Sequence, residues 1–447
     1  MNITKDKIYL VQNEGQISIE KLNNTVNLTV LYTLAVIPLV FVPLGGETDH
    51  FYLPKVIAMI TLVLSFLLVQ LKNKIKFSSF VKNDLVNKTL FIYFVLIALS
   101  VFSADNKLLA ILGIPGRYEG LITIALYFML FMIARLYNDF NDKLFLVVLI
   151  TAIIVSIYGI LQTFGIDPFP RDIMRLTWGK RAFATMGNPN FLGSYIVLVL
   201  PISIYLYIIK RNYIGLVGYI ILFYCLLSTN TRGAWLGTIV SIICFVTMHY
   251  IYYKYNKAEF KRYIILFMIT IIILLLYNHN SDGALLNRFL TITADAKEFM
   301  TDGERADYTG AHRGFIWKRV IELIKLRPLT GYGLENLGEV FLKYYSEDMI
   351  KLWDRVKYVD KAHNEYLHIA VSSGIPTLLV YLSFLLLIIR NGLMKLKSND
   401  NLMLLLLSSV IGYMAAAFFN ISVVSVAYIY WIFLGLIVSY RSNKLNV

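Results

Sequence analysis

The apolar residues of this chain of 447 residues fall into blocks of about twenty, separated by shorter polar segments. A helix of that length crosses about 30 Å of hydrocarbon. The chain is 58% hydrophobic and only 16% charged, whereas soluble domains carry about 25% charged residues. In lipid each backbone amide must find its partner within its own segment, so an open chain crosses as helices. The sequence therefore predicts an all-α, polytopic membrane protein and excludes a water-soluble enzyme.

Twelve spans are predicted, of which the third is short and the tenth begins with polar residues. The polar, acid-containing N-terminal segment does not have the character of a cleaved signal peptide, so the first span is expected to be an uncleaved helix. The predicted spans are 27–45, 52–71, 89–104, 118–136, 144–164, 190–209, 213–229, 233–253, 263–278, 366–390, 401–419 and 421–440.

Lysine and arginine set the expected orientation. They concentrate in the connections 72–88, 254–262 and 390–397, which all fall on one side of a twelve-span topology. An excess of basic residues marks the cytoplasmic side. The expected organisation is a cytoplasmic tail, spans 1–9, a large outer loop, spans 10–12 and a second cytoplasmic tail. Their residues are 1–26, 27–278, 279–365, 366–440 and 441–447.

The formal charge of +14 does not indicate nucleic-acid binding, because the basic residues are spread between the hydrophobic spans. Cytoplasmic anchoring and contact with anionic lipid explain them better. Cys225 and Cys244 both fall inside spans and are expected to pack as small apolar residues. No Cys/His zinc pattern is present, and Asp302 and Glu304 make only a weak metal site, so neither a metal nor another cofactor is expected.

Outward arginines run against the positive-inside rule. Arg117 lies in a glycine-flanked outer turn, and the segment 165–189 carries Arg171, Arg175, Lys180 and Arg181. One interpretation is contact with lipid headgroups, and the other is an anion site. The outer position of Arg117 and Arg232 favours the anion site.

Turn residues follow Arg181. Pro189 suits the first turn of the sixth span, with Asn188 as its N-cap and Asn190 directly after it. This pattern describes either a well-capped helix or a helix N-terminus that offers its free N–H groups to an anion. Asn188 and Asn190 are therefore candidate ligands of an anionic group, together with Arg181.

Two further arginines lie in predicted outer segments. Arg232 stands at an outer turn before Gly233 and Gly237, which leave room for backbone or ligand; it either snorkels to headgroups or grips a phosphate. Arg313 begins an amphipathic segment whose apolar residues recur at helical spacing, and which is expected to lie against the membrane surface. Arg313 is either a solvated residue of that helix or another phosphate ligand.

His363 lies where the large loop returns to the membrane. A neutral imidazole is the usual acceptor of a proton from a hydroxyl, although a capping or interfacial role fits these residues as well. Asn364 or Glu365 is expected to fix its tautomer. Cations and one base, without a nucleophile or a metal cluster, indicate a phosphate leaving group held by arginine while histidine deprotonates an attacking hydroxyl.

The order of these motifs resembles the O-antigen ligase and polymerase family of integral-membrane glycosyltransferases, from about residue 90 to 440. The motifs are Gly116–Gly120, Arg181–Gly193, Thr231–Gly237, His312–Trp317, Gly331–Gly333 and His363–Leu367. The resemblance implies an extracytoplasmic active site and a metal-independent, inverting transfer. It implies that His363 is the base and that Arg232 and Arg313 handle the diphosphate, with Arg181 and Arg117 in support.

The expected activity is transfer of a glycan from a polyprenyl (undecaprenyl) diphosphate to an acceptor in the cell envelope, at the plasma or inner membrane. The acceptor is lipid A–core, a cell-wall polymer or a protein. Three alternatives stay open. The protein could be a surface-polysaccharide polymerase, a transporter of anions or glycolipids that is similar to bicarbonate transporters, or a scaffold subunit. The absence of an internal repeat and of paired broken spans speaks against transport.

Overall fold

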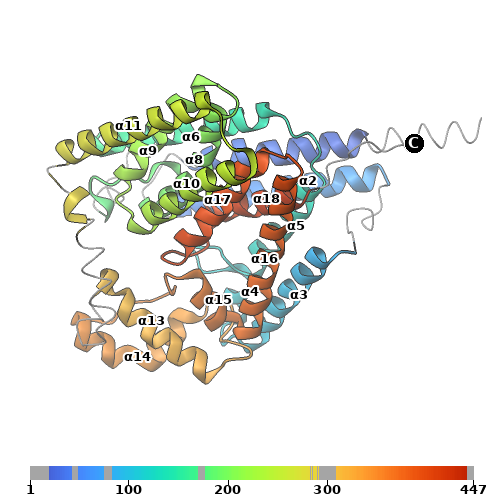
Figure 1. Cartoon of the computed structure of the whole chain (residues 1–447). Helices are drawn as coiled ribbons and strands as arrows, with labels where there is room; N and C mark the ends of the chain where they lie inside the picture. The colour runs from blue at the N-terminus through green and yellow to red at the C-terminus, as the bar shows by residue number, and fades with distance from the viewer. Residues whose placement is uncertain are drawn as a thin grey trace, which may run out of the picture.

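The computed structural model describes residues 20–42, 49–74, 83–169, 177–281, 283, 285–288, 290 and 309–439, which are helical and contain no β-strand. Twelve apolar helices within these residues follow the order of the twelve predicted spans (Figure 1). Eight are long and apolar enough to cross a membrane: Glu20–Leu39, α2 (Asp49–Lys72), Leu85–Ser103 (α3 with the turn η3), α6 (Asp142–Thr163), α8 (Pro189–Ile208), α10 (Arg232–Tyr253), α11 (Lys257–Asn280) and α16 (Ile375–Lys397).

Four shorter apolar helices complete the set: α5 (Leu121–Arg135), α9 (Tyr213–Ser228), α17 (Leu402–Ala417) and α18 (Ala427–Val438). The predicted all-α, polytopic membrane fold is thereby confirmed for the described residues. The boundaries differ in places. The first helix begins at Glu20 and ends at Leu39, rather than spanning 27–45, because Pro38 lies in a terminal 3-10 turn, where the helix ends.

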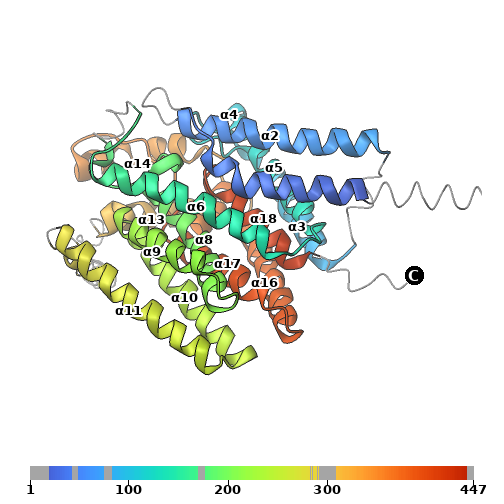
Figure 2. The same cartoon turned by 90° about the horizontal axis from the view of Figure 1, so that it is seen from above.

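Helix α8 forms the centre of the apolar bundle. Its residues from Phe191 to Ile208 are all buried, and α6, α9, α10 and α17 pack around it. Glycine allows the closest of these contacts: a Cβ added at Gly237 of α10 would lie 2.7 Å from the carbonyl oxygen of Gly412 in α17. The space left by this glycine is therefore filled by a neighbouring helix. Helix α11 lies at the outer edge of the bundle (Figure 2), where only Leu266 and Ile273 are buried.

The large loop forms a second layer below the apolar helices (Figure 1). It contains α13 (Thr309–Leu326) and α14 (Leu337–Trp353), which share a hydrophobic core with α15 (Glu365–Ser373). Phe315 of α13 meets Phe341 of α14 with ring centroids 6.1 Å apart. The prediction of a helix here is confirmed, and its position against the membrane surface stays a prediction, but its apolar face does not contact lipid. That face is covered by protein, because α14 and α15 supply a complementary apolar surface.

The predicted tenth span is two helices. The chain breaks at Gly374, which has φ +87°, so that α15 ends at Ser373 and the spanning helix α16 begins at Ile375. Pro376 occupies the first turn of α16, where proline is tolerated. The break explains the polar start of the predicted segment, since α15 belongs to the outer layer. The tails 1–19 and 441–447, Arg171, Arg175 and the Asp302–Glu304 segment lie outside the described residues.

Replacing Gly374 with Ala is expected to destabilise the join between α15 and α16 by about 1–3 kcal/mol. The left-handed backbone disfavours a side chain, and the new Cβ would lie 2.1 Å from the carbonyl oxygen of Leu329. Thermal unfolding of the purified protein in detergent measures the loss. Gly179→Ala is the matched control, because Gly179 also has positive φ but has no atom within 4 Å of the added Cβ. Equal effects of both changes would contradict the steric explanation.

Candidate active site

Asn188 and Pro189 begin α8 as predicted. The side-chain oxygen of Asn188 accepts a hydrogen bond from the backbone N–H of Asn190 at 2.8 Å, and Pro189 lies in the first turn. Gly187, with φ +74°, turns the chain just before the cap. This local chemistry fixes the direction in which the preceding segment, with Arg181, approaches the helix.

Arg181 is clamped onto the turn between α9 and α10. Its Nε donates to the carbonyl oxygen of Thr229 at 2.9 Å, and its Nη2 donates to Thr231 Oγ1 at 3.3 Å and Asn190 Oδ1 at 3.4 Å. All three acceptors are neutral, so the guanidinium is positioned but its charge is not balanced by them. Because Arg232 follows Thr231 directly, Arg181 lies beside the first turn of α10.

Trp317 ties the loop layer to the histidine segment. Its indole N–H donates to the carbonyl oxygen of Ala362 at 2.9 Å, one residue before His363. Arg313 lies one helical turn before Trp317 on the same face of α13. The backbone of α13 therefore brings Arg313 and His363 into the same region.

The Trp317 ring also reaches the start of α10. Its centroid lies 6.3 Å from that of Phe419, in the turn after α17. A Cβ added at Gly233 would lie 2.9 Å from the Cβ of Phe419, which places Arg232 next to this aromatic contact. Four segments distant in sequence thus meet at one end of the bundle, and we call Arg181, Arg232, Arg313 and His363 the arginine–histidine cluster.

The pKa of Arg313 shows how closely the cations of this cluster lie together. Burial and repulsion from Arg232, Arg181 and Arg288 lower its pKa to about 10. Burial and Arg288 likewise lower the pKa of Arg181 to about 10. Among the residues that the structure describes, Arg313 has neither a hydrogen-bond nor an ion-pair partner. A cation that has no acidic partner among the described residues and lies among other cations attracts an anion strongly.

His363 is half-buried and adopts a left-handed backbone conformation, with φ +52°. Burial and the neighbouring Arg313 lower its pKa to about 4, with Asp360 opposing the shift. The imidazole is therefore neutral at physiological pH and has a nitrogen available to accept a proton.

The expectation that Asn364 or Glu365 fixes the tautomer of His363 stays a prediction, and the described contacts give both side chains other partners. Asn364 Oδ1 instead accepts from the backbone N–H of Leu367 at 3.0 Å and caps α15. Glu365 Oε1 accepts from the hydroxyl of Tyr381 at 3.2 Å. The physical reason is local: a residue that starts a helix uses its acceptor for the free N–H groups of the first turn, and Glu365 extends toward α16.

Arg117 lies beside the histidine segment and forms an ion pair with Asp360, with Nε and Oδ2 2.7 Å apart. The pKa of the Asp360 carboxyl is lowered overall, because the charge of Arg117 and its hydrogen bond outweigh the opposite effect of burial. The group therefore stays ionised. Arg117 thus holds the chain three residues before His363. The Arg117 guanidinium therefore already has a carboxylate partner within the protein.

Several polar residues of this region are not predictable from the sequence. Lys361 and Glu335 form an ion pair whose side chains are only 2% and 1% exposed. Arg288, which acts on both Arg181 and Arg313, was not singled out either. Their partners come from distant segments, so the printed sequence contains no spacing signal for them. Within the described ranges, no three His, Cys, Asp or Glu side chains are arranged to hold a metal ion.

A cavity of about 870 Å³ adjoins Arg181 at the ends of α6, α9 and α11. Its wall combines cations and amides with aromatic rings, which suits an amphiphilic ligand. The residues with these properties are Lys180, Arg181, Asn230, Asn280, Phe164, Tyr224 and Tyr277.

Comparison with known proteins shows two similarities. Residues 217–382 match the family model described as O-antigen ligase, a region that contains Arg232, Arg313 and His363 but not Arg117 or Arg181. The chain is also 28% identical over 248 residues to the general O-oligosaccharyltransferase of Acinetobacter baylyi, a match that covers 54% of this chain and 40% of that relative. Together these similarities confirm the resemblance seen in the motifs: residues 217–382 are similar to the O-antigen ligase family, and the chain spans less than half the length of the relative that it matches.

Proposed function

We propose that this protein is a membrane glycosyltransferase that moves a glycan from a polyprenyl diphosphate to an acceptor hydroxyl or amide. The observation that carries the proposal is Arg313, a cation with no acidic partner among the described residues, surrounded by other arginines and adjacent to a neutral histidine. The acceptor is an envelope lipid, polymer or protein. The cluster faces the exterior or the periplasm, opposite the lysine-rich connections.

The arginines would bind the diphosphate. Guanidinium groups grip phosphate oxygens in pairs of hydrogen bonds, and a diphosphate supplies enough negative charge to offset several of them. Arg181 borders the cavity of about 870 Å³, so the diphosphate would lie at the arginines while the first isoprene units occupy the aromatic side of the cavity. Binding would relieve the repulsion that lowers the pKa of Arg313.

His363 would act as the general base. It takes the proton of the acceptor O–H or N–H as that atom forms a bond to the anomeric carbon. The bond between that carbon and the diphosphate oxygen breaks, and its electron pair leaves with the diphosphate. Attack opposite the leaving group inverts the anomeric centre. Arg232, Arg313 and Arg181 stabilise the charge that develops on the diphosphate, and the bound diphosphate raises the pKa of His363 from its depressed value.

Transfer is expected to lose activity only at strongly acidic pH. The folded protein lowers the pKa of His363 to about 4, so the basic form persists as the pH falls and is lost only as the pH passes through that value. The kcat/KM, which reports ionisations of the free enzyme, should stay level down to about pH 5. An acid limb centred near the ordinary histidine pKa of about 6.5 would contradict the half-buried, cation-flanked setting of His363.

The proposal is tested with purified protein in liposomes that contain a fluorescent polyprenyl-diphosphate oligosaccharide. A membrane extract of the cells that naturally produce this protein supplies the acceptor. A covalently labelled acceptor, formed together with free polyprenyl diphosphate and without an ion gradient, is the expected result. Movement of the donor across the bilayer without a covalent product would refute the proposal in favour of transport.

A further inference from the structure

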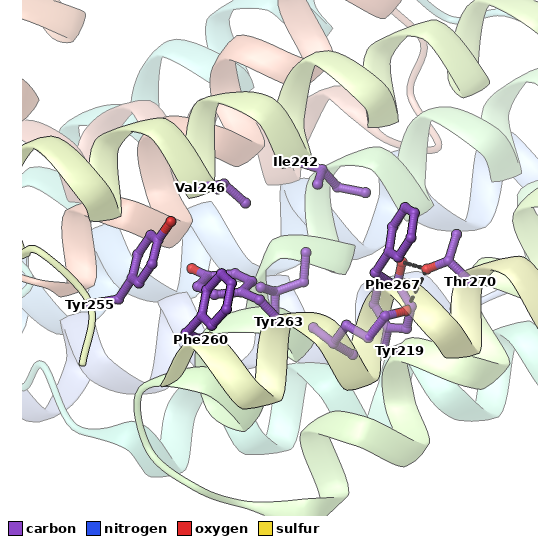
Figure 3. Close-up of a pocket in the computed structure, with 10 residues that line it drawn as sticks. Tyr219, Ile242, Val246, Tyr255, Phe260, Tyr263, Phe267 and Thr270 are labelled. Carbon is purple, nitrogen blue, oxygen red and sulfur yellow. Dashed lines mark hydrogen bonds between the residues drawn. The ribbon is translucent and has the colours of Figure 1, made fainter. Parts of the chain in front are cut away.

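A second cavity lies among α8, α9, α10 and α11, away from the arginine–histidine cluster. It has a volume of about 340 Å³ (Figure 3). Ile242 and Val246 of α10 face Phe260 and Phe267 of α11 across it, while residues of α8 and α9 also line it. We call this space the α10–α11 groove. Helix α11, which forms one wall, is the helix at the outer edge of the bundle.

The groove lies along the halves of α10 and α11 that are farther from the cluster. Helix α10 begins at Arg232 and ends at Tyr253, a length of about 30 Å at 1.5 Å per residue. Tyr255, in the turn beyond that end, and Phe260, in the first turns of α11, line the groove. A ligand here would therefore occupy the other leaflet from a ligand at the cluster.

The groove offers hydrocarbon contact rather than hydrogen bonds. The hydroxyl groups of Tyr219 and Thr270 bond each other at 2.7 Å (Figure 3). The hydroxyl of Tyr263 pairs with Nδ1 of His249 at 2.8 Å. With these polar atoms engaged inside the protein, aromatic rings and aliphatic side chains make up the remaining wall. An acyl chain is the complementary shape and chemistry.

The groove reaches Tyr255 in the turn between α10 and α11, and we call this basic turn the mouth of the groove. Lys254, Lys257 and Lys261 are exposed around the turn that leads into α11, and Arg262 follows directly. The Nε atom of Arg262 is buried and has no hydrogen-bond partner in the described structure. Glu259, the acid of this stretch, is engaged in capping α11, where it accepts from the backbone N–H of Asn256 at 2.9 Å. The mouth therefore has an excess of positive charge.

We propose that the α10–α11 groove is a binding site for one anionic phospholipid. An acyl chain fills the groove, and the headgroup phosphate is held by Lys257, Lys261 and Arg262. Such juxtamembrane cations attract anionic headgroups across about one Debye length. The site goes beyond the proposed transfer reaction, because it lies at the end of α10 and α11 remote from the arginine–histidine cluster and needs no part of that chemistry.

The test compares binding of dioleoylphosphatidylglycerol and dioleoylphosphatidylcholine to the full purified chain by native mass spectrometry. The wild-type protein is expected to retain the anionic lipid preferentially. The triple variant K257Q/K261Q/R262Q should weaken phosphatidylglycerol binding by on the order of 100-fold. Val246→Trp, which fills the groove, should lower retention of that lipid without changing the charge at the mouth.

Matched controls separate the site from general effects. K72Q/K88Q/K397Q removes three exposed lysines from other basic connections, and Ile243→Trp adds the same ring at an exposed position of α10 outside the groove. Both controls should bind phosphatidylglycerol as the wild type does. Equal loss in control and test variants, or equal retention of the two lipids by the wild type, would overturn the proposal. Displacement of bound phosphatidylglycerol by a polyprenyl phosphate would also overturn it, by assigning the groove to the donor lipid.

Discussion

Replacing His363 with Ala is expected to lower the rate of glycan transfer by about 10²–10⁴-fold, the usual contribution of a general base. The side chain is neutral at physiological pH and lies beside Arg313. The described residues give it no structural hydrogen bond to lose. Transfer to acceptor is measured in the liposome assay with saturating donor, so that the loss appears in the reaction step rather than in binding.

The left-handed backbone at His363 requires a second variant, since Ala is less tolerant of positive φ than His. His363→Asn keeps a residue that accepts this conformation but removes the base, and it should lose as much activity as His363→Ala. His279→Ala is the control, because His279 is exposed at the end of α11. Near-normal transfer by His363→Asn in a folded protein would refute the assignment of the base.

The helices were predictable because their causes are local. Length and apolar content identify a spanning helix, and the Asn188-Pro189 pair begins α8 through contacts within two residues. Local pattern also identified α13 as an amphipathic helix. The pattern did not reveal what covers the apolar face of α13, because a helix needs the same apolar face whether it packs on a bilayer or on protein. Phe315 faces α14 for a reason that lies outside its own segment.

The assembly of the site was less predictable, because it depends on contacts between distant segments. The hydrogen bond from Trp317 to Ala362 joins residues 45 apart, and the Arg181–Thr229 hydrogen bond joins residues 48 apart. Residue type and turn context identified candidate arginines in the sequence. They did not indicate which of these arginines lie close together in the structure. Asp360, the partner of Arg117, was overlooked for the same reason.

Local spacing is ambiguous where two roles compete for one side chain. Asn364 and Glu365 follow His363 directly, so sequence proximity made them candidates to orient the imidazole. The start of α15 uses Asn364 as its cap, and Tyr381 engages Glu365. A helix start that closely follows a candidate base therefore competes with that base for polar neighbours, and capping is the interaction that the described contacts contain.

Replacing Arg313 with Ala is expected to reduce transfer by about 10²–10³-fold, the effect of removing one charged donor from a developing anion. Arg313→Lys should recover only part of this loss, since an ammonium lacks the planar fork that grips two phosphate oxygens. Lys325→Ala is the control: it removes one exposed cation from the same helix α13. Donor binding and turnover are measured separately, because a phosphate ligand should affect both.

The pH profile distinguishes an electrostatic role of Arg313 from a merely structural one. Arg313 is, after burial, the largest cause of the depressed pKa of His363. Its removal should therefore raise that pKa toward about 6.5, and the acid limb of the residual activity should move to higher pH. Arg313→Lys, which keeps the charge, should leave the limb near its original position. A residual activity in Arg313→Ala with an unshifted acid limb would mean that Arg313 does not lower the pKa of His363, and that its role is structural.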